Sequence, residues 1–339
     1  MTSHGGNIYA FAKKLGCSPS DIIDFSSNIH FKQAVDWREL PLNLQPYADP
    51  NYTDLKYAIK QRYALMDDVE LELFNGASSA IFALLRFLAS DCVVFYAPMF
   101  SEYENVTGEF ESTVHFINRF NEKLLFESVP KNSTIVFVNP STPDGKPYDM
   151  YEFFTHWKAQ NCTVIVDESF LDFCDLPSMF DFIADYDQLF IVKSLCKFYG
   201  CAGVRVGFIA AQKEAIEALK IYEPMWKIST FDSVYMQAAL KNIAFIEQTR
   251  IETKRLRAKL EQVLSHSNLF EKIYDGSVNF VLAHLKNKEL NLQKELAQFK
   301  ILIRECDSFD FLSSSDIRFA VKSQADIEKL ALALASIHV

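Results

Sequence analysis

Short apolar runs alternate with helix-like segments from residue 71 to residue 211. Seven runs rich in Val, Ile and Phe occur in this region, and in order they read LELF, CVVFYA, VHFI, TIVFVN, CTVIVD, LFIVKS and VRVGFIAA. Between them lie segments whose apolar residues recur at helical spacing, such as residues 78–89 and 150–159. Runs that are apolar throughout are typical of strands covered on both faces. The pattern therefore predicts an α/β fold with a seven-stranded, mostly parallel sheet.

The rest of the chain predicts a smaller α/β unit. Residues 229–265 carry long helical periodicity, which predicts one helix that bridges into this unit. Strand-like and helix-like segments then alternate, and they read GSVNFVLAHL, LNLQKELAQFK, ILIREC, DIRFAV and ADIEKLALALASIHV. A chain of 339 residues is also longer than one core comfortably serves. We therefore expect an N-terminal arm over residues 1–45, a large domain over residues 46–228 and a small domain over residues 229–339.

Composition narrows the range of partners. Hydrophobic residues at 49% and charged residues at 23% are ordinary for a globular protein. The 34 basic and 44 acidic side chains give a net charge of -10, which argues against nucleic acid or an anionic membrane as the partner. No apolar run is long enough to span a membrane. Seven cysteines without a CxxC pair, and an opening without a secretory pattern, predict a reduced, cytoplasmic location.

The stretch KSLCKFYGCAGVRVGF places one lysine between two candidate anion-binding groups. Lys197 has Ser194 three residues before it and Arg205 eight residues after it. Glycines between them permit a tight, irregular backbone. The plain alternative is a strand, a glycine turn and a second strand that carry an ordinary surface lysine.

Polar residues follow the ends of other apolar runs, where ligands bind in open α/β sheets. The segment NGASS, residues 75–79, follows the first run and opens a helix, so its amides and hydroxyls are suited to hold a phosphate. Asp167 closes the fifth run. Arg304 and Arg318 each lie in a strand-like run near the C-terminus, and an arginine fork suits carboxylate or phosphate. For either arginine alone, a surface ion pair is the ordinary alternative.

Several of these segments resemble those of one known family. Four segments are similar to motifs of the fold-type I pyridoxal-phosphate enzymes. They are the pattern SxxKxxGxAGxRxG around Lys197, the opening HGGN, the segment DFSSNI at residues 24–29 and the two strand-like runs near the C-terminus that carry Arg304 and Arg318. The branch they resemble contains the threonine-phosphate decarboxylases and the histidinol-phosphate aminotransferases, and the resemblance extends over the whole chain. It implies a fold-type I architecture, pyridoxal 5'-phosphate as cofactor and a homodimer with both active sites at the interface. No metal site is implied.

The resemblance assigns cofactor contacts by position. Lys197 would form a Schiff base with the cofactor, and Asp167 would pair with its pyridinium nitrogen. Phe100 would stack on the ring. Thr142 stands where relatives carry an asparagine that bonds the cofactor's 3'-oxygen. The cofactor phosphate would be held by Gly76, Ala77, Ser78, Ser194 and Arg205, together with Tyr47 from the neighbouring subunit.

The resemblance also assigns substrate contacts. Arg318 would bind the substrate α-carboxylate, while Arg304, His4 and nearby amides would bind a substrate phosphate. The whole expected set is His4, Gly5, Asn28, Thr142, Arg304 and Arg318. The sequence departs from its relatives at His30, which replaces the usual proline, so the turn after Asn28 is expected to differ.

Two activities of this branch fit these residues. The first is decarboxylation of L-threonine O-3-phosphate or L-serine O-phosphate to a phosphorylated amino alcohol for cobamide synthesis. The second is transamination of the histidinol-phosphate type. They differ in which bond at the substrate Cα stands perpendicular to the ring, Cα–COO⁻ or Cα–H. Phe170 in DESFLDF favours the decarboxylases, because aminotransferases often carry a tyrosine there. A dehydrogenase on a doubly wound sheet would need an early GxGxxG, which the sequence lacks.

Overall fold

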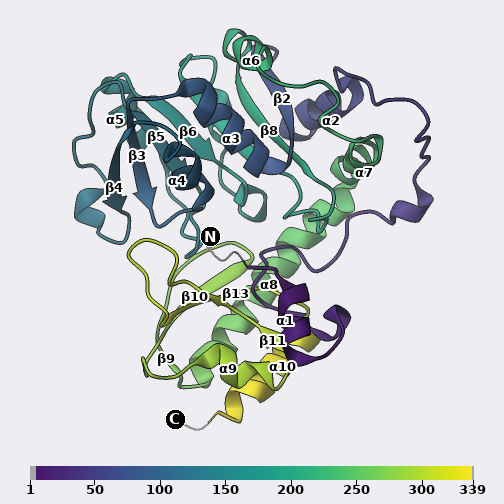
Figure 1. Ribbon diagram of the computed structural model, residues 1–339, viewed down its shortest axis with the longest axis vertical. Coiled ribbons are helices and arrows are strands. Elements are labelled where there is room, and N and C mark those ends of the chain that lie inside the picture. The colour runs from purple at the N-terminus through teal and green to yellow at the C-terminus, as the bar shows by residue number, and fades with distance from the viewer. Residues whose placement is uncertain (1–4, 338–339) are drawn as a thin grey trace.

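The computed structural model describes residues 5–337 and contains a seven-stranded sheet (Figure 1). Its strand order is β2-β8-β7-β6-β5-β3-β4. Strand β8 runs antiparallel to β2 and β7, and the other pairings are parallel. The strands are β2 (Val69–Asn75), β3 (Cys92–Ala97), β4 (Thr113–Asn118), β5 (Thr134–Val138), β6 (Thr163–Asp167), β7 (Leu189–Ser194) and β8 (Val206–Gln212). The predicted seven-stranded, mostly parallel sheet is therefore confirmed.

Helices cover both faces of this sheet, which explains why its strands are apolar throughout. Residues such as Phe95 and Val136 pack with α3, α4 and α6 on one face. Their chain neighbours Val94 and Phe137 pack with α2, α5 and α7 on the other face, because successive strand side chains point in opposite directions. The helices are α2 (Thr53–Tyr63), α3 (Gly76–Leu88), α4 (Glu102–Thr107), α5 (Met150–Ala159), α6 (Lys213–Lys220) and α7 (Thr230–Lys241).

A second, antiparallel sheet forms the C-terminal part, in the order β12-β13-β10-β9 (Figure 1). Near the N-terminus, β1 pairs in parallel with β11, so this part of the chain lies against the C-terminal core. The elements are α1 (Ile8–Leu15), β1 (Ile23–Asp24), α8 (Ile243–His266), β9 (Phe270–Ile273), β10 (Phe280–Leu285), α9 (Leu292–Ala297), β11 (Ile301–Leu302), β12 (Arg304–Glu305), β13 (Asp316–Ala320) and α10 (Gln324–Ala335). Short 3₁₀ turns occur at Pro19–Asp21, Trp37–Glu39, Glu122–Leu124, Leu171–Phe173 and Met179–Phe182.

The expectation of one long helix over residues 229–265 is wrong. Two helices, α7 and α8, are separated by Asn242. The Asn242 side chain accepts a hydrogen bond from the amide of Phe245 and donates one to the carbonyl oxygen of Ala34 at 2.9 Å. An asparagine that bonds nearby backbone competes with the helical ladder and starts a new helix. Helix α8 alone continues from the large sheet down to the C-terminal sheet (Figure 1).

Within residues 5–337, no helix combines the length and the apolar character needed to cross a membrane.

Candidate active site

A cavity of about 220 Å³ lies where β5, β6 and β7 end and the C-terminal sheet approaches them. Side chains from the N-terminal segment and from both sheets line it. Of the site residues expected from the sequence, those that line the cavity are Gly5, Asn28, Ala77, Ser78, Phe100, Thr142, Asp167, Ser194, Lys197, Arg205, Arg304 and Arg318. The fold therefore brings together residues that lie far apart along the chain.

Lys197 lies on the turn that follows β7, with its side chain at the cavity. Its carbonyl oxygen accepts a hydrogen bond from the amide of His30 at 2.9 Å, which anchors the turn. The Lys197 ammonium nitrogen lies 4.3 Å from the centroid of the Phe170 ring. Burial lowers the pKa of Lys197, and the charge of Asp167 opposes that shift. A lysine whose pKa is lowered reacts more readily with a carbonyl group.

Asp167 ends β6 and is held in one orientation. Its Oδ2 accepts a hydrogen bond from the Tyr103 hydroxyl at 3.1 Å, and its Oδ1 accepts one from the Ser169 amide at 2.8 Å. Only 4% of the Asp167 surface is exposed. A buried and oriented carboxylate at this position is suited to pair with a cationic group of a ligand.

The N-terminus of α3 opens onto the cavity beside Arg205. Ala77 and Ser78 line the cavity, and the Asn75 side chain does not cap the helix. Uncapped amides in the first turn of a helix attract anions. Gly76 has a φ of 78° and lies so close to Arg205 that an added Cβ would collide with Nη2. The helix start and the guanidinium are thus placed to bind one anion together.

Arg304 and Arg318 lie directly opposite each other on β12 and β13, and both line the cavity. Arg318 Nη1 donates to Thr142 Oγ1 at 3.2 Å, and Nη2 donates to the Ser26 carbonyl oxygen at 3.2 Å. Among residues 5–337, the buried Nε of Arg318 has no hydrogen-bond partner. Burial, with a further contribution from Arg304, lowers the pKa of Arg318 to about 10. Two guanidiniums this close favour an anionic ligand between or beside them.

The loop of residues 26–29 forms another wall, and the C-terminal part of the chain holds it. Lys322 Nζ donates to the Ser27 carbonyl oxygen at 2.9 Å, and Asn279 Nδ2 donates to that of Asn28 at 3.0 Å. The Oδ1 atom of Asn28 is buried and has no hydrogen-bond partner within the described chain. This amide oxygen is therefore available to a ligand.

Two of the described residues expected at the site do not line this cavity. Gly76, at the start of α3, lies next to the Arg205 guanidinium. Tyr47 is 81% exposed and stacks on Trp226 with 4.8 Å between ring centroids, so its contact with the cofactor of a second subunit stays a prediction. His4 lies outside the described residues. His30, which replaces the usual proline, is buried, and its Nδ1 lies 3.1 Å from the Lys32 carbonyl oxygen.

Four residues that orient the site were not predicted from the sequence. Tyr103 positions Asp167, and its place three residues after Phe100 at the start of α4 was an available signal. Phe309 lines the cavity, with its ring centroid 5.4 Å from the Arg304 guanidinium. Lys322 and Asn279 act through backbone carbonyl groups, which leave no pattern in the sequence.

Comparison with known proteins identifies the class of this protein. Residues 32–335 match the family model for aminotransferase class I and II, and the chain belongs to this family. It is 29% identical over 360 positions to the adenosylcobalamin biosynthesis bifunctional protein CobDQ of Leptospira interrogans, and the match covers 99% of this chain and 41% of that protein. It is 26% identical over 356 positions to the threonine-phosphate decarboxylase of Salmonella typhimurium, covering 99% and 96%. The chain thus spans less than half of the bifunctional relative.

Solved structures share the fold. The histidinol-phosphate aminotransferase of Clostridium acetobutylicum superposes with a TM-score of 0.84 at 25% identity, covering 93% of this chain and 98% of that one. The enzyme of the same name from Sinorhizobium meliloti, solved with pyridoxal-5'-phosphate, gives a TM-score of 0.82 at 18% identity, covering 98% and 95%. The fold-type I architecture is confirmed, and the cofactor of this family is pyridoxal 5'-phosphate.

The cavity fits this cofactor. It offers an anion site at the start of α3 with Arg205, an amine at Lys197, a carboxylate at Asp167 and an aromatic face at Phe100. These are the four kinds of group that a phosphate, an aldehyde, a pyridinium nitrogen and a planar ring require.

Proposed function

We propose that this enzyme decarboxylates L-threonine O-3-phosphate or L-serine O-phosphate and releases a phosphorylated amino alcohol used in cobamide synthesis. The observation that carries the proposal is the pair of buried arginines, Arg304 and Arg318, in one cavity with Lys197. A small substrate with a carboxylate and a phosphate supplies the two anions that such a pair binds. The names of the Leptospira and Salmonella relatives support the same reaction.

In this proposal the protein holds the cofactor and controls its charge. Pyridoxal phosphate, when bound, supplies an electron sink for the bond broken at the substrate Cα. Asp167 keeps the ring nitrogen protonated, because a carboxylate beside it stabilises the charged form. Lys197 Nζ holds the cofactor before the substrate arrives and then delivers a proton to the carbon that has lost CO₂. The start of α3, Ser194 and Arg205 bind the cofactor phosphate.

The same proposal assigns the choice of bond to the two ends of the substrate. Arg318 binds the carboxylate, and Arg304 with nearby amides and, as the sequence predicts, His4 binds the phosphate. A substrate held at both ends has a fixed torsion about Cα, so the protein decides which bond stands perpendicular to the ring. Thr142 Oγ1 accepts from Arg318 and sets the direction of that guanidinium.

The active form in this proposal is a homodimer. Large apolar side chains are exposed together near Tyr47, and they include Ile221, Tyr222, Met225 and Trp226. A hollow of about 1050 Å³ lies beside them against α3, and Ser78 lines both this hollow and the active-site cavity. An exposed apolar patch beside an active-site helix suits a second copy of the chain. Sedimentation equilibrium should give a dimer at micromolar concentration, and a monomer would contradict this part of the proposal.

A single-turnover experiment without any keto acid tests the reaction. The pyridoxal form of the enzyme should release CO₂ from phosphothreonine or phosphoserine while its visible spectrum returns to the starting state. The alternative is an aminotransferase of the histidinol-phosphate type. The similarity to the Clostridium structure, which bears that name, supports this alternative. Such an aminotransferase would convert the cofactor to pyridoxamine phosphate and release no gas. Comparing both phosphoamino acids also shows whether the substrate methyl group is accepted, a choice worth about 1–3 kcal/mol in an apolar pocket.

A further inference from the structure

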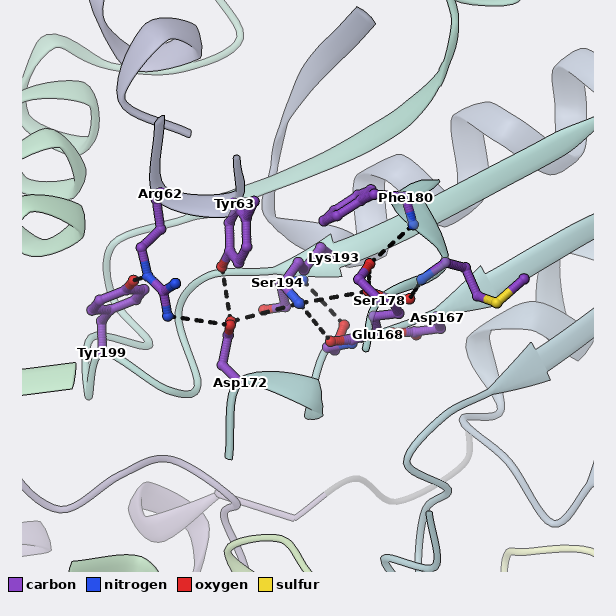
Figure 2. A network of polar contacts seen from close by, with 12 residues as sticks. Arg62, Tyr63, Asp167, Glu168, Asp172, Ser178, Phe180, Lys193, Ser194 and Tyr199 are labelled. Atoms are coloured by element: carbon purple, nitrogen blue, oxygen red, sulfur yellow. Dashed lines mark hydrogen bonds and ion pairs between the residues drawn. The ribbon is translucent and has the colours of Figure 1, made fainter. Parts of the chain in front are cut away.

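Three buried charged side chains and one partly buried arginine lie together on the side of β6 and β7 that faces away from the cavity. Figure 2 shows their contacts. Lys193 Nζ lies 3.8 Å from Glu168 Oε2 and 3.7 Å from Asp172 Oδ2. Arg62 Nη2 lies 3.7 Å from Asp172 Oδ1. The side chains of Lys193, Glu168 and Asp172 are 1%, 2% and 6% exposed. We call Arg62, Glu168, Asp172 and Lys193 the far-face cluster.

Neutral groups add further contacts to the far-face cluster, although Arg62 Nη2 has no hydrogen-bond partner within residues 5–337. The Tyr63 hydroxyl donates to Asp172 Oδ2 at 2.8 Å, and the centroid of its ring lies 4.8 Å from Lys193 Nζ. The Ser178 hydroxyl donates to Glu168 Oε2 at 2.6 Å. Two positive and two negative groups balance one another. Because a buried ion pair adds little net stability over apolar residues of the same size, the role of the cluster is to be sought in the geometry that it fixes.

Two residues of the cluster, Glu168 and Lys193, are chain neighbours of cavity residues. Glu168 follows Asp167, and Lys193 precedes Ser194, so side-chain alternation sends one member of each pair to the cavity and the other to the cluster. The pairing of β6 with β7 extends as far as Asp167 and Val192. Just beyond it, Lys193 Nζ donates to the Glu168 carbonyl oxygen at 3.4 Å.

The turn of residues 168–172 carries an aromatic wall of the active site. The Phe170 ring lies against Lys197. The centroids of the Phe170 ring and of the Phe280 ring on β10 are 5.0 Å apart. Lys193 contacts both ends of this turn, at Glu168 and Asp172 (Figure 2). One ammonium group therefore spans the segment on which Phe170 is mounted.

The cluster also joins the turn to two helices. Arg62 comes from α2 and binds Asp172 from the side opposite to Lys193. Arg250 Nε of α8 donates to the Asp172 carbonyl oxygen at 2.9 Å. Since α8 continues to the C-terminal sheet, the position of this turn is tied to the part of the chain that carries Arg318.

We propose that Lys193 is a positioning residue for the cofactor. Its ammonium binds Glu168 and Asp172 and so fixes the turn after β6. This holds Asp167 and Phe170 in one position and orientation relative to the pyridine ring of the cofactor. The proposal rests on pyridoxal phosphate being the cofactor of this family and not on which bond the enzyme breaks. Its failure would leave the proposed decarboxylation untouched, and the reverse also holds.

The test compares Lys193→Met with Lys193→Arg. Two quantities are measured on the purified protein: the dissociation constant of pyridoxal phosphate and the pH midpoint of the visible absorbance of the bound cofactor. Lys193→Met should weaken cofactor binding about tenfold and move the midpoint by about half a pH unit, because Asp167 loses its fixed position. Lys193→Arg keeps a cation between the two carboxylates and should return both quantities most of the way to the wild-type values.

A double variant separates positioning from the cost of unpaired charge. Lys193→Met with Glu168→Gln leaves Arg62 and Asp172 as a balanced pair, so the apoprotein should regain most of its resistance to urea. The cofactor defects should persist in it, because the tether across the turn is still missing. Recovery of the wild-type midpoint and affinity in the double variant would show that the cluster acts through stability alone and would overturn the proposal.

A matched control uses Lys227, another lysine whose side chain lies largely buried between two carboxylates. Lys227 Nζ is 2.7 Å from Glu72 Oε1 and 2.9 Å from Glu223 Oε2, and its side chain is 8% exposed. Lys227→Met should lower resistance to urea as Lys193→Met does, and should leave the absorbance midpoint in place. An equal shift of the midpoint in Lys227→Met would mean that any buried lysine has this effect, and the positioning role of Lys193 would then fall.

Discussion

The charged side chains on the two faces of β6 and β7 have different surroundings. On the cavity face lie Asp167, Lys197 and, from the C-terminal sheet, Arg318, whose Nε lacks a partner within residues 5–337. On the far face, Lys193 lies between two carboxylates that also receive hydroxyl hydrogen bonds. The charges of one set thus face the cavity, whereas each charged group of the other set lies within 3.8 Å of an opposite charge of the chain.

The difference shows which charges serve a ligand and which serve the protein. Burying a cation without a counter-ion destabilises the folded chain, so a protein keeps such a group where a ligand will compensate it. Burial lowers the pKa of both Lys197 and Arg318, which is the physical sign of this cost. The far face shows that this chain is able to pair charged groups with opposite charges away from the cavity.

The largest expected effect comes from the lysine on the cavity face. Lys197→Ala should lower turnover by about 10⁴-fold, because it removes both the cofactor linkage and the proton carrier. Borohydride reduction of the wild type, followed by peptide mapping, should place the reduced pyridoxyl group on Lys197. Label on another lysine, or turnover near normal in the variant, would contradict the assignment. The apoprotein of Lys197→Ala should be at least as resistant to urea as the wild type, since the lost amine was buried at a cost.

Unequal changes in stability should follow from removing one cation on each face. Lys193→Met leaves two buried carboxylates without their shared partner and should cost the apoprotein about 3–5 kcal/mol of unfolding free energy. Arg318→Met removes a buried cation that burial disfavours, but it also leaves Thr142 Oγ1 and the Ser26 carbonyl oxygen without their donor, so the two effects should offset and the apoprotein should change by about 1 kcal/mol or less. Urea unfolding of the two apoproteins measures both values. Equal losses in the two variants would remove the distinction between the faces.

Within the cavity face, the two arginines should differ in what they recognise. Arg304→Gln should reduce kcat/KM for phosphothreonine by about 100-fold, because the proposal assigns it the substrate phosphate, a charge-assisted contact worth about 2–3 kcal/mol. The same variant should bind an unphosphorylated amino acid nearly as the wild type does. Measuring binding of threonine and phosphothreonine to both enzymes checks this. Equal weakening for both ligands would show that Arg304 does not read the phosphate.

The cavity face could be predicted from the sequence better than the far face. Asp167 and Lys197 follow apolar runs whose carboxyl ends meet at one edge of a parallel sheet, so their meeting follows from the run pattern. The roles of Arg304 and Arg318 came from resemblance, because strand spacing does not say which part of a second sheet faces the first.

The far-face cluster had no comparable signal. Glu168 and Lys193 are each next to a predicted site residue, and the sequence gives no sign that Asp172 and Arg62 approach them from a turn and a distant helix. The break at Asn242 was missed for a related reason. Apolar periodicity continues across it, and only the contact with Ala34, more than two hundred residues earlier in the chain, shows why the helix restarts.

His30 belongs to neither face and provides the smallest expected effect. It holds the Lys197 turn through its backbone amide, while its buried ring packs against Phe31 and Phe245 at 4.7 and 5.6 Å between centroids. Burial lowers the pKa of His30, and the charges of Glu252, Lys32 and Lys322 make smaller contributions of both signs. The ring is therefore neutral in the folded chain at neutral pH.

A lowered pKa in the folded state gives the sign of the pH dependence. The stability that neutral His30 contributes is present above its unfolded pKa of about 6.5 and is lost as pH falls below that value toward the folded pKa. The wild type should lose up to about 1.4 kcal/mol per pH unit in this window through His30. The Lys32 amide lies 3.3 Å from His30 Nδ1. His30→Asn keeps an acceptor for this amide and cannot titrate there, so its unfolding free energy should fall less steeply between pH 6.5 and 5, whatever its value at pH 7.5. Urea unfolding at four pH values measures the two slopes, and parallel slopes would contradict a neutral buried ring. The cofactor absorbance midpoint should stay in place, because His30 supports Lys197 through the main chain and a change of side chain leaves that hydrogen bond intact.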